Sequence, residues 1–100
     1  MDGVQQLTVI QQEDKVLVRS YPNPFTEKLN LEFSLPVDSK ARLDIFSSNG
    51  KKIATLFDGQ VKADELRKVE YNPVTTANGL VLYRLQTNKG VYYGKAVMVK

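Results

Sequence analysis

The stretch from Ala41 to Phe57, "ARLDIFSSNGKKIATLF", sets two runs of alternating apolar and polar residues on either side of an Asn-Gly pair. In the first run, Ala41, Leu43 and Ile45 share one side of an extended chain, as they do in a strand with one buried face. Asn-Gly between two such runs is the strongest short-range signal for a β-hairpin, because a two-residue type I′ turn needs positive φ at both central positions. The stretch therefore predicts a hairpin with its turn at Asn49-Gly50 and "KIATLF" at 52–57 as its second strand.

The same period of two recurs on both sides of this hairpin. Residues 28–35, "KLNLEFSL", place four large apolar side chains on one face, namely Leu29, Leu31, Phe33 and Leu35, and polar side chains on the other. Further candidate strands are "VLVRSY" at 16–21, with Val16 and Val18 on one face, "RKVEYN" at 67–72, "LVLYRLQT" at 80–87 and "VYYGKAVMVK" at 91–100. The last two flank Asn88-Lys89-Gly90, which predicts a three-residue loop with glycine in the left-handed position. Residues 58–66 and 74–79 are expected to be loops.

These segments predict an all-β fold. About seven short strands with turn signals roughly every 8–12 residues, and no segment of helical period, are typical of an immunoglobulin-like antiparallel β-sandwich. One hundred residues, 42% hydrophobic and 25% charged, fit a single globular domain. We expect this domain to span residues 16–100. Residues 1–15, "MDGVQQLTVIQQEDK", are glutamine-rich and are predicted to be a linker or a lead added for expression.

Charge and hydropathy exclude several classes of partner. The net charge of +3 comes from fourteen basic and eleven acidic residues, and the basic ones are scattered rather than gathered into the dense stripe that phosphate binding favours. We therefore expect no nucleic-acid partner. No apolar run approaches the length of about 18 residues needed to span a bilayer, so no direct membrane insertion is expected. Met1-Asp2-Gly3 does not open a signal peptide, and any export address is expected upstream or within the domain itself.

The residue types needed for most catalysis are missing. The chain has no histidine and no cysteine, so the commonest general base, the thiol nucleophile and the preferred transition-metal ligands are absent. The carboxylates considered as a glycosidase pair are expected to be solvated, in loops or on the wet faces of strands: Asp38, Asp44, Asp58, Asp64, Glu65 and Glu70. The spacing of the acidic residues in 58–65 matches no calcium loop. We expect no enzymatic activity, no cofactor and no metal.

The aromatic residues leave a second class of function open. Nine rings in a β-sandwich can form the stacking face of an ancillary carbohydrate-binding or adhesive module. Phe33 lies on the apolar face of its predicted strand and is expected in the core. Adjacent residues of a strand point to opposite faces, so Tyr92-Tyr93 must send one ring to each. A purely structural spacer domain is a third alternative.

Residues 20–33, "SYPNPFTEKLNLEF", put two of the four prolines around one asparagine. Pro22 and Pro24 fix φ near −65° and bias the residues before them toward extended geometry. This makes residues 21–25 a stiff connector between two strands, which Tyr21 and Phe25 are expected to pin to the sandwich. The connector is also a candidate label for recognition by another protein, and the two roles are compatible.

The order of these segments resembles a known family. "YPNPFTEKLNLEFSLP", "ARLDIFSSNGKKIATLFDG" and "GLVLYRLQTNKGVYYGKAVMVK" follow one another as in the type A C-terminal sorting domain of the type IX secretion system of Bacteroidota, over residues 18–100. The matching motifs are the Pro-Asn-Pro corner, the Asn-Gly hairpin, the "G-x-x-x-Y-R-L" strand and the final "G-x-x-x-G-K-x-V-x-x-K". One departure is the spacing between Gly79 and Tyr83, because this family often has Gly-hydrophobic-Tyr there.

The resemblance implies a transport signal rather than a catalyst. In this family the domain follows an upstream cargo in the same chain and directs it across the outer membrane through machinery that includes an outer-membrane shuttle protein. A cell-surface sortase often removes the domain. The implied location is the periplasm in transit and then the cell surface or the medium. The residues implied in recognition are Pro22, Asn23, Pro24, Gly50, Gly79, Tyr83, Gly90, Gly94, Lys95 and Lys100.

The final strand, residues 91–100, is expected at a sheet edge. Unpaired backbone groups at such an edge can add to a receptor's sheet, and Lys89, Lys95 and Lys100 would give the strand a positive signature. The competing interpretation is that the lysines guard the edge against aggregation, while Gly90 and Gly94 serve a turn and a bulge.

Overall fold

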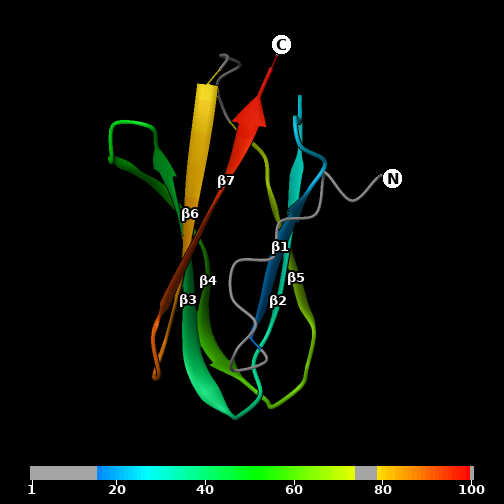
Figure 1. The fold of residues 1–100 in the computed structure, drawn as a ribbon, viewed down its shortest axis with the longest axis vertical. Coiled ribbons are helices and arrows are strands. Elements are labelled where there is room, and N and C mark those ends of the chain that lie inside the picture. The colour runs from blue at the N-terminus through cyan, green and yellow to red at the C-terminus, as the bar shows by residue number, and fades with distance from the viewer. Residues whose placement is uncertain (1–15, 74–78, 100) are drawn as a thin grey trace.

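Two antiparallel sheets pack face to face in the computed structural model, which describes residues 16–73 and 79–99. One sheet has the order β1-β2-β5, formed by Leu17–Tyr21, Leu29–Ser34 and Arg67–Tyr71. The other has the order β4-β3-β6-β7, formed by Lys52–Val61, Ser39–Ser47, Gly79–Thr87 and Val91–Met98. Figure 1 shows the second sheet on the left and the first on the right. The predicted all-β, immunoglobulin-like sandwich is confirmed. The predicted lead at 1–15 and Lys100 lie outside the described residues.

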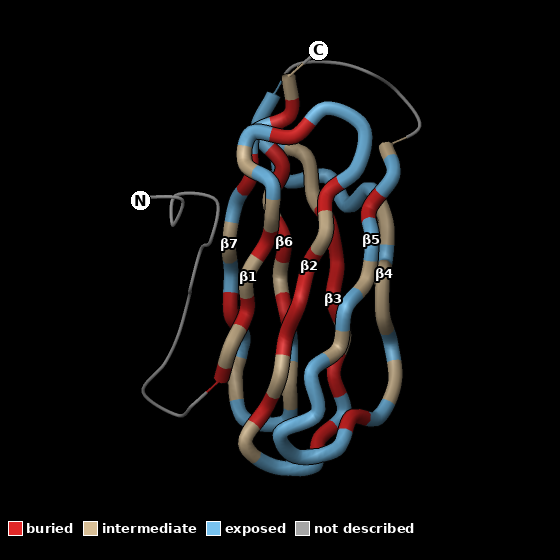
Figure 2. The backbone as a smooth tube through the Cα atoms, turned by 90° about the vertical axis from the view of Figure 1, so that its right-hand side faces the viewer, coloured by how far each residue is buried: buried red, intermediate tan, exposed pale blue. Residues whose placement is uncertain are grey.

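The core lies between the sheets and is built by the alternation of the strands (Figure 2). Every residue assigned to an inner face from the sequence is buried: Val16, Val18, Leu29, Leu31, Phe33, Leu35, Ala41, Leu43 and Ile45. The last two strands complete this core with Val81, Tyr83, Leu85, Tyr92, Ala96 and Met98. Each large apolar side chain that is fully buried contributes roughly 1.5–3 kcal/mol by leaving water, so a core of this size needs no cross-link.

Aromatic pairs close the sandwich at both ends. Phe33 of β2 meets Phe57 of β4 edge to face, with ring centroids 5.5 Å apart. Phe25, which is only 1% exposed, meets Tyr71 at the end of β5 in the same way at 6.5 Å. Edge-to-face geometry sets the positive ring edge against the negative face of the partner.

The predicted hairpin at Asn49-Gly50 exists, but its turn differs from the predicted type I′. Ser47 N donates to Lys51 O, and Gly50 N donates to Ser47 O, both at 2.8–2.9 Å. The loop therefore has three residues, with Gly50 at φ 89°, while Asp64 is the only non-glycine residue with positive φ in the described ranges. This kind of loop, a type I turn followed by glycine, needs only one left-handed residue. Its backbone twist still matches the right-handed twist of the two flanking strands.

Two further details of the sequence-based prediction are wrong. β4 continues to Val61, four residues beyond the predicted end, because Asp58 and Gly59 pair with Arg42 and Ala41 of β3 instead of turning. Gly90 has no left-handed φ. The loop there is closed by Thr87 N donating to the carbonyl of Gly90 at 2.8 Å, which leaves two residues at its tip.

Candidate recognition surface

Residues 21–25, the corner, leave β1 and lie along the outer edge of β7. Phe25 N donates to Val97 O at 2.8 Å, and Val99 N donates to Phe25 O at 2.9 Å, which makes a short parallel bridge. The side chain of Asn23 continues it, because its Oδ1 accepts from Val97 N at 2.9 Å. The Tyr21-Pro22 and Asn23-Pro24 peptide bonds are both cis.

The corner therefore joins segments that lie 74 residues apart in the chain. It pairs the backbone of Val97 and Val99 on their outer side, the side that a receptor strand would use. We call Val97–Val99 the capped edge. The three corner residues assigned to recognition from the family motif, Pro22, Asn23 and Pro24, are thus placed against the last strand, where Asn23 has a defined structural contact.

Tyr83 and Gly94 form a second pair of motif residues. They are directly opposite each other in the regular antiparallel pairing of β6 with β7. Tyr83 is fully buried, and a Cβ added at Gly94 would lie 2.3 Å from its ring. The ring occupies the space that any side chain at position 94 needs. Because the pairing has no register shift, the bulge that the competing interpretation placed at Gly94 is absent, and the glycine is required by this close approach.

The hydroxyl of Tyr83 is buried without a hydrogen-bond partner among the described residues, and so is the hydroxyl of Ser20. Burial raises the pKa of Tyr83, and the nearby Ser20 hydroxyl opposes this shift without reaching hydrogen-bond geometry. A buried polar group without a partner costs roughly 1–3 kcal/mol.

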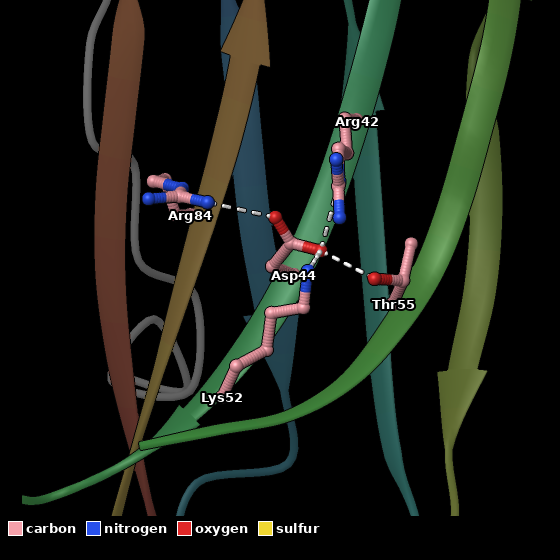
Figure 3. Close-up of polar contacts among 5 residues, drawn as sticks. All are labelled: Arg42, Asp44, Lys52, Thr55 and Arg84. Atoms are coloured by element: carbon pink, nitrogen blue, oxygen red, sulfur yellow. Dashed lines mark hydrogen bonds and ion pairs between the residues drawn. The ribbon is translucent and has the colours of Figure 1, made fainter. Parts of the chain in front are cut away.

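Asp44 lies on the outer face of the four-stranded sheet, as the alternation predicts, but the expectation that it is solvated is wrong. It is fully buried beneath side chains from three strands (Figure 3). Its carboxylate accepts from Thr55 Oγ1 at 2.7 Å and from Arg84 Nη2 at 2.9 Å. Arg42 Nε lies at 3.3 Å and Lys52 Nζ at 3.7 Å.

These contacts set the charge state of the carboxylate. Burial alone raises the pKa of Asp44, but hydrogen bonds from Thr55, Arg84 and Arg42 outweigh it and hold the pKa below its usual value. On the opposite sheet, Glu32 is a smaller counterpart that accepts from Tyr21 Oη and Arg19 Nε, both at 2.6 Å. The Tyr21 hydrogen bond is the main reason that its pKa is also lowered.

The register of β3, β6 and β7 aligns a cationic face around Asp44, which we define as Arg42, Lys52, Arg84 and Lys95. Asp44, Arg84 and Tyr93 form one row across the three strands, and Phe46, Leu82 and Lys95 form the next. The Arg84 guanidinium stacks over the Phe46 ring at 4.8 Å from its centroid. Arg84 belongs to the "Y-R-L" motif, but the sequence alone gave it no role. Its role depends on the strand pairing that places it opposite Asp44, which the sequence does not show.

The sequence-assigned residues do not form one site. Gly79 and the corner lie at the end of β7 that carries Met98, and Gly50 lies at the same end in the β3–β4 turn. Gly90 lies at the opposite end, and Tyr83 and Gly94 lie in the middle. Lys95 points outward from β7 and is exposed. They are distributed along the length of the final hairpin and its surroundings.

The described residues offer little for small-molecule chemistry. Two shallow pockets of about 300 and 380 Å³ flank the β6–β7 loop, the first polar and the second lined in part by Val16, Leu35 and Tyr92. No group of three or more acidic, histidine or cysteine side chains is placed to hold a metal ion in the described ranges. Nor does this part of the chain contain a helix long and apolar enough to cross a membrane. Tyr92 is buried, so a sugar-stacking platform would rest on Tyr93, which is 59% exposed.

Comparison with protein families decides the assignment. The model of the secretion system C-terminal sorting domain matches residues 19–100, nearly the whole of the described structure. The chain belongs to this family of type IX sorting domains. The resemblance read from the motif order is confirmed, and the function of the family is that of a C-terminal sorting signal, not of an enzyme. No match was found among curated proteins.

Proposed function

We propose that this sorting domain is recognised as a folded module by the type IX machinery, carried by an outer-membrane shuttle protein, and cut from its cargo by a cell-surface sortase. The observation that supports the proposal is the family match over residues 19–100. A domain attached to varied cargoes must fold without help from them. This one has a closed core shared by all seven strands, and it has no cysteine to require cross-linking.

The route implies two compartments and a connector. The cargo passes through the periplasm and reaches the cell surface or the medium. We assign residues 1–15 to the linker between cargo and domain, and we place the sortase cut in or before that linker. Residues 16–100 are then the part that the machinery recognises.

A reporter fusion tests this proposal. The 100-residue chain is fused behind a reporter with a signal peptide and expressed in a strain with a type IX system and in a matched strain without it. We expect the reporter at the surface or in the medium of the first strain alone, shortened by about the size of the domain. Retention in the periplasm of the first strain contradicts the sorting function. Export at full length contradicts the cleavage step alone.

A further inference from the structure

The four sheet edges of this molecule differ in how they are protected. An exposed edge presents unpaired N–H and C=O groups, and proteins usually blunt it with short strands, bulges, prolines or covering segments. β1 and β5 have five residues each. β4 carries two register shifts against β3. The corner covers one half of β7. The other half, Val91–Lys95, which we call the open edge, is regular, and within residues 16–73 and 79–99 none of these devices protects it except one lysine.

The contacts of the capped edge show which N–H and C=O groups of the open edge point away from β6. Val97 uses both its N–H and its C=O on the side away from β6, to bind Asn23 and Phe25. In an antiparallel pair this orientation repeats every second residue. Val91, Tyr93 and Lys95 therefore also direct their N–H and C=O groups outward. They are opposite Gln86, Arg84 and Leu82 in the ladder and form none of its hydrogen bonds.

The charged residues of the hairpin that carries the open edge all have one sign. The β6–β7 hairpin, residues 79–98, contains Arg84, Lys89 and Lys95 and no acidic residue. Lys95 makes no ion pair with any residue in the described ranges. Val91 and Tyr93 are 44% and 59% exposed beside it. Pairing with a second copy of the chain would bring two cationic hairpins together. An acidic strand offers the complementary charge.

We propose that the open edge, Val91–Lys95, binds an extended, acidic segment of a protein of the secretion machinery by strand addition. The outward backbone groups of Val91, Tyr93 and Lys95 supply the hydrogen bonds. Lys95 selects the acidic side chain, and the corner limits the added strand by occupying the edge from Val97 onward. This inference rests on the proposed sorting function and names the surface and the chemistry of its partner.

The test uses point variants of the whole chain in the reporter fusion. They change separately the backbone N–H of residue 93, the Tyr93 ring and the charge of Lys95. Tyr93→Pro removes an N–H that faces away from β6, so the ladder within the domain is retained. Tyr93→Thr removes the ring and keeps the N–H. Lys95→Glu reverses the charge at the open edge, and Lys62→Glu makes the same change at an exposed position just beyond β4, the strand at the other edge of this sheet.

We expect export to fall about tenfold or more with Tyr93→Pro, as the loss of a hydrogen bond and the steric block together weaken binding, and to fall several-fold with Lys95→Glu. Tyr93→Thr and Lys62→Glu should be exported like the parent. Circular dichroism and thermal melting of the purified chains verify folding. If Tyr93→Pro does not fold, the Lys95→Glu and Lys62→Glu pair decides: equal export overturns the inference.

Other outcomes are distinguishable. Failure of the parent fusion to leave the periplasm overturns the sorting function and this inference with it. Parental export of a folded Tyr93→Pro chain overturns the inference alone. If sedimentation velocity shows a dimer of the parent chain that Tyr93→Pro abolishes, the open edge binds a second copy of the chain, and the inference of an acidic partner strand is overturned. The chain could also float with phosphatidylglycerol vesicles. If Lys95→Glu abolishes this flotation and Tyr93→Pro does not, Lys95 binds an anionic membrane surface and not a strand, which also overturns the inference.

Discussion

The two halves of β7 share one backbone geometry and differ in what lies on their outer side. In the capped edge, Val97 and Val99 bind the corner through three hydrogen bonds. In the open edge, Val91–Lys95 pairs with β6 alone among the described elements. The same strand therefore serves as a closing element of the fold at one end and as an accessible edge at the other. Motif residues near the capped edge, such as Asn23, have a folding role that is visible in their contacts.

Gly94 lies within the open edge, and substituting it should have the largest effect on the strand as a whole. Gly94→Ala puts a Cβ 2.3 Å from the Tyr83 ring, which forces the buried ring or the strand to move. We expect a loss of about 3 kcal/mol in the free energy of unfolding, measured by urea denaturation. Gly59→Ala, where the nearest atom is 3.6 Å from the added Cβ, is the matched control and should change stability little. Equal effects would show that the Tyr83 contact does not require the glycine.

The face beside the open edge depends on Asp44. Asp44→Asn keeps the shape and removes the charge that holds Arg84 and Arg42 in place. Breaking a fully buried ion pair costs about 3–5 kcal/mol, and because the basic side chains here are partly exposed, we expect about 2 kcal/mol. Thr55→Val removes a neutral partner of the same carboxylate and should cost less. An Asp44→Asn chain as stable as the parent would contradict the structural role of the cluster.

Acid should weaken the molecule through the same cluster. The pKa values of Asp44 and Glu32 are lowered in the folded state. Their ionised forms therefore contribute their full stabilisation above the pKa values of the unfolded chain, which are about 4. That contribution is lost as the pH falls through the folded pKa values. Unfolding free energies measured from pH 6 downward should decline below about pH 4, and Asp44→Asn should flatten the decline. An unchanged pH profile in Asp44→Asn would assign the acid sensitivity elsewhere.

Opening the capped edge should have a smaller effect. Asn23→Ala removes the acceptor for Val97 N, and a hydrogen bond of this kind contributes about 1 kcal/mol. Amide exchange, followed by nuclear magnetic resonance, should become faster at Val97 and stay slow at Val99, which is held by the backbone of Phe25. In the parent, Tyr93 in the open edge should already exchange fast. Slow exchange at Tyr93 in the isolated parent chain would mean that this edge is already protected.

The smallest change is expected from removing a hydroxyl. Tyr83→Phe deletes a buried group that has no hydrogen-bond partner among the described residues and keeps the ring over Gly94. Stability should stay within about 0.5 kcal/mol of the parent or rise slightly, because an unsatisfied buried group is removed. Thermal melting is the measurement. A clear loss would reveal a partner for the hydroxyl, and Ser20→Ala, which removes its buried neighbour, would then reproduce that loss.

The alternation of the sequence was sufficient to predict the strands and their inner faces. Leu29, Leu31 and Phe33 are buried as predicted because a single residue's shift would turn all of them to solvent. The end of β4 was missed because "DGQ" has the composition of a turn, while its pairing with β3 depends on a strand distant in the sequence. Local propensity carries no information about that partner.

The arrangement of the candidate recognition residues was predictable only in part. The motif order identified Tyr83 and Gly94, but not that one occupies the side-chain space of the other, since this requires the β6–β7 register. Asp44 lies on the predicted outer face of its strand, but it is buried and not solvated as predicted. Strand pairing places arginines and a threonine over it, and the sequence alone does not reveal that pairing. Asn23 was identified as part of a corner, and its partner Val97 became visible only in the folded chain.

The contacts between the corner and β7 also bear on the completeness of the chain. β7 supplies Tyr92, Ala96 and Met98 to the core and holds Phe25 through Val97 and Val99. A product that stops short of residue 91 lacks these side chains and leaves the outer edge of β6 unpaired. It therefore cannot complete the sandwich that we propose the export machinery recognises. Under the proposed function, cargo truncated during synthesis would therefore lack a folded sorting signal.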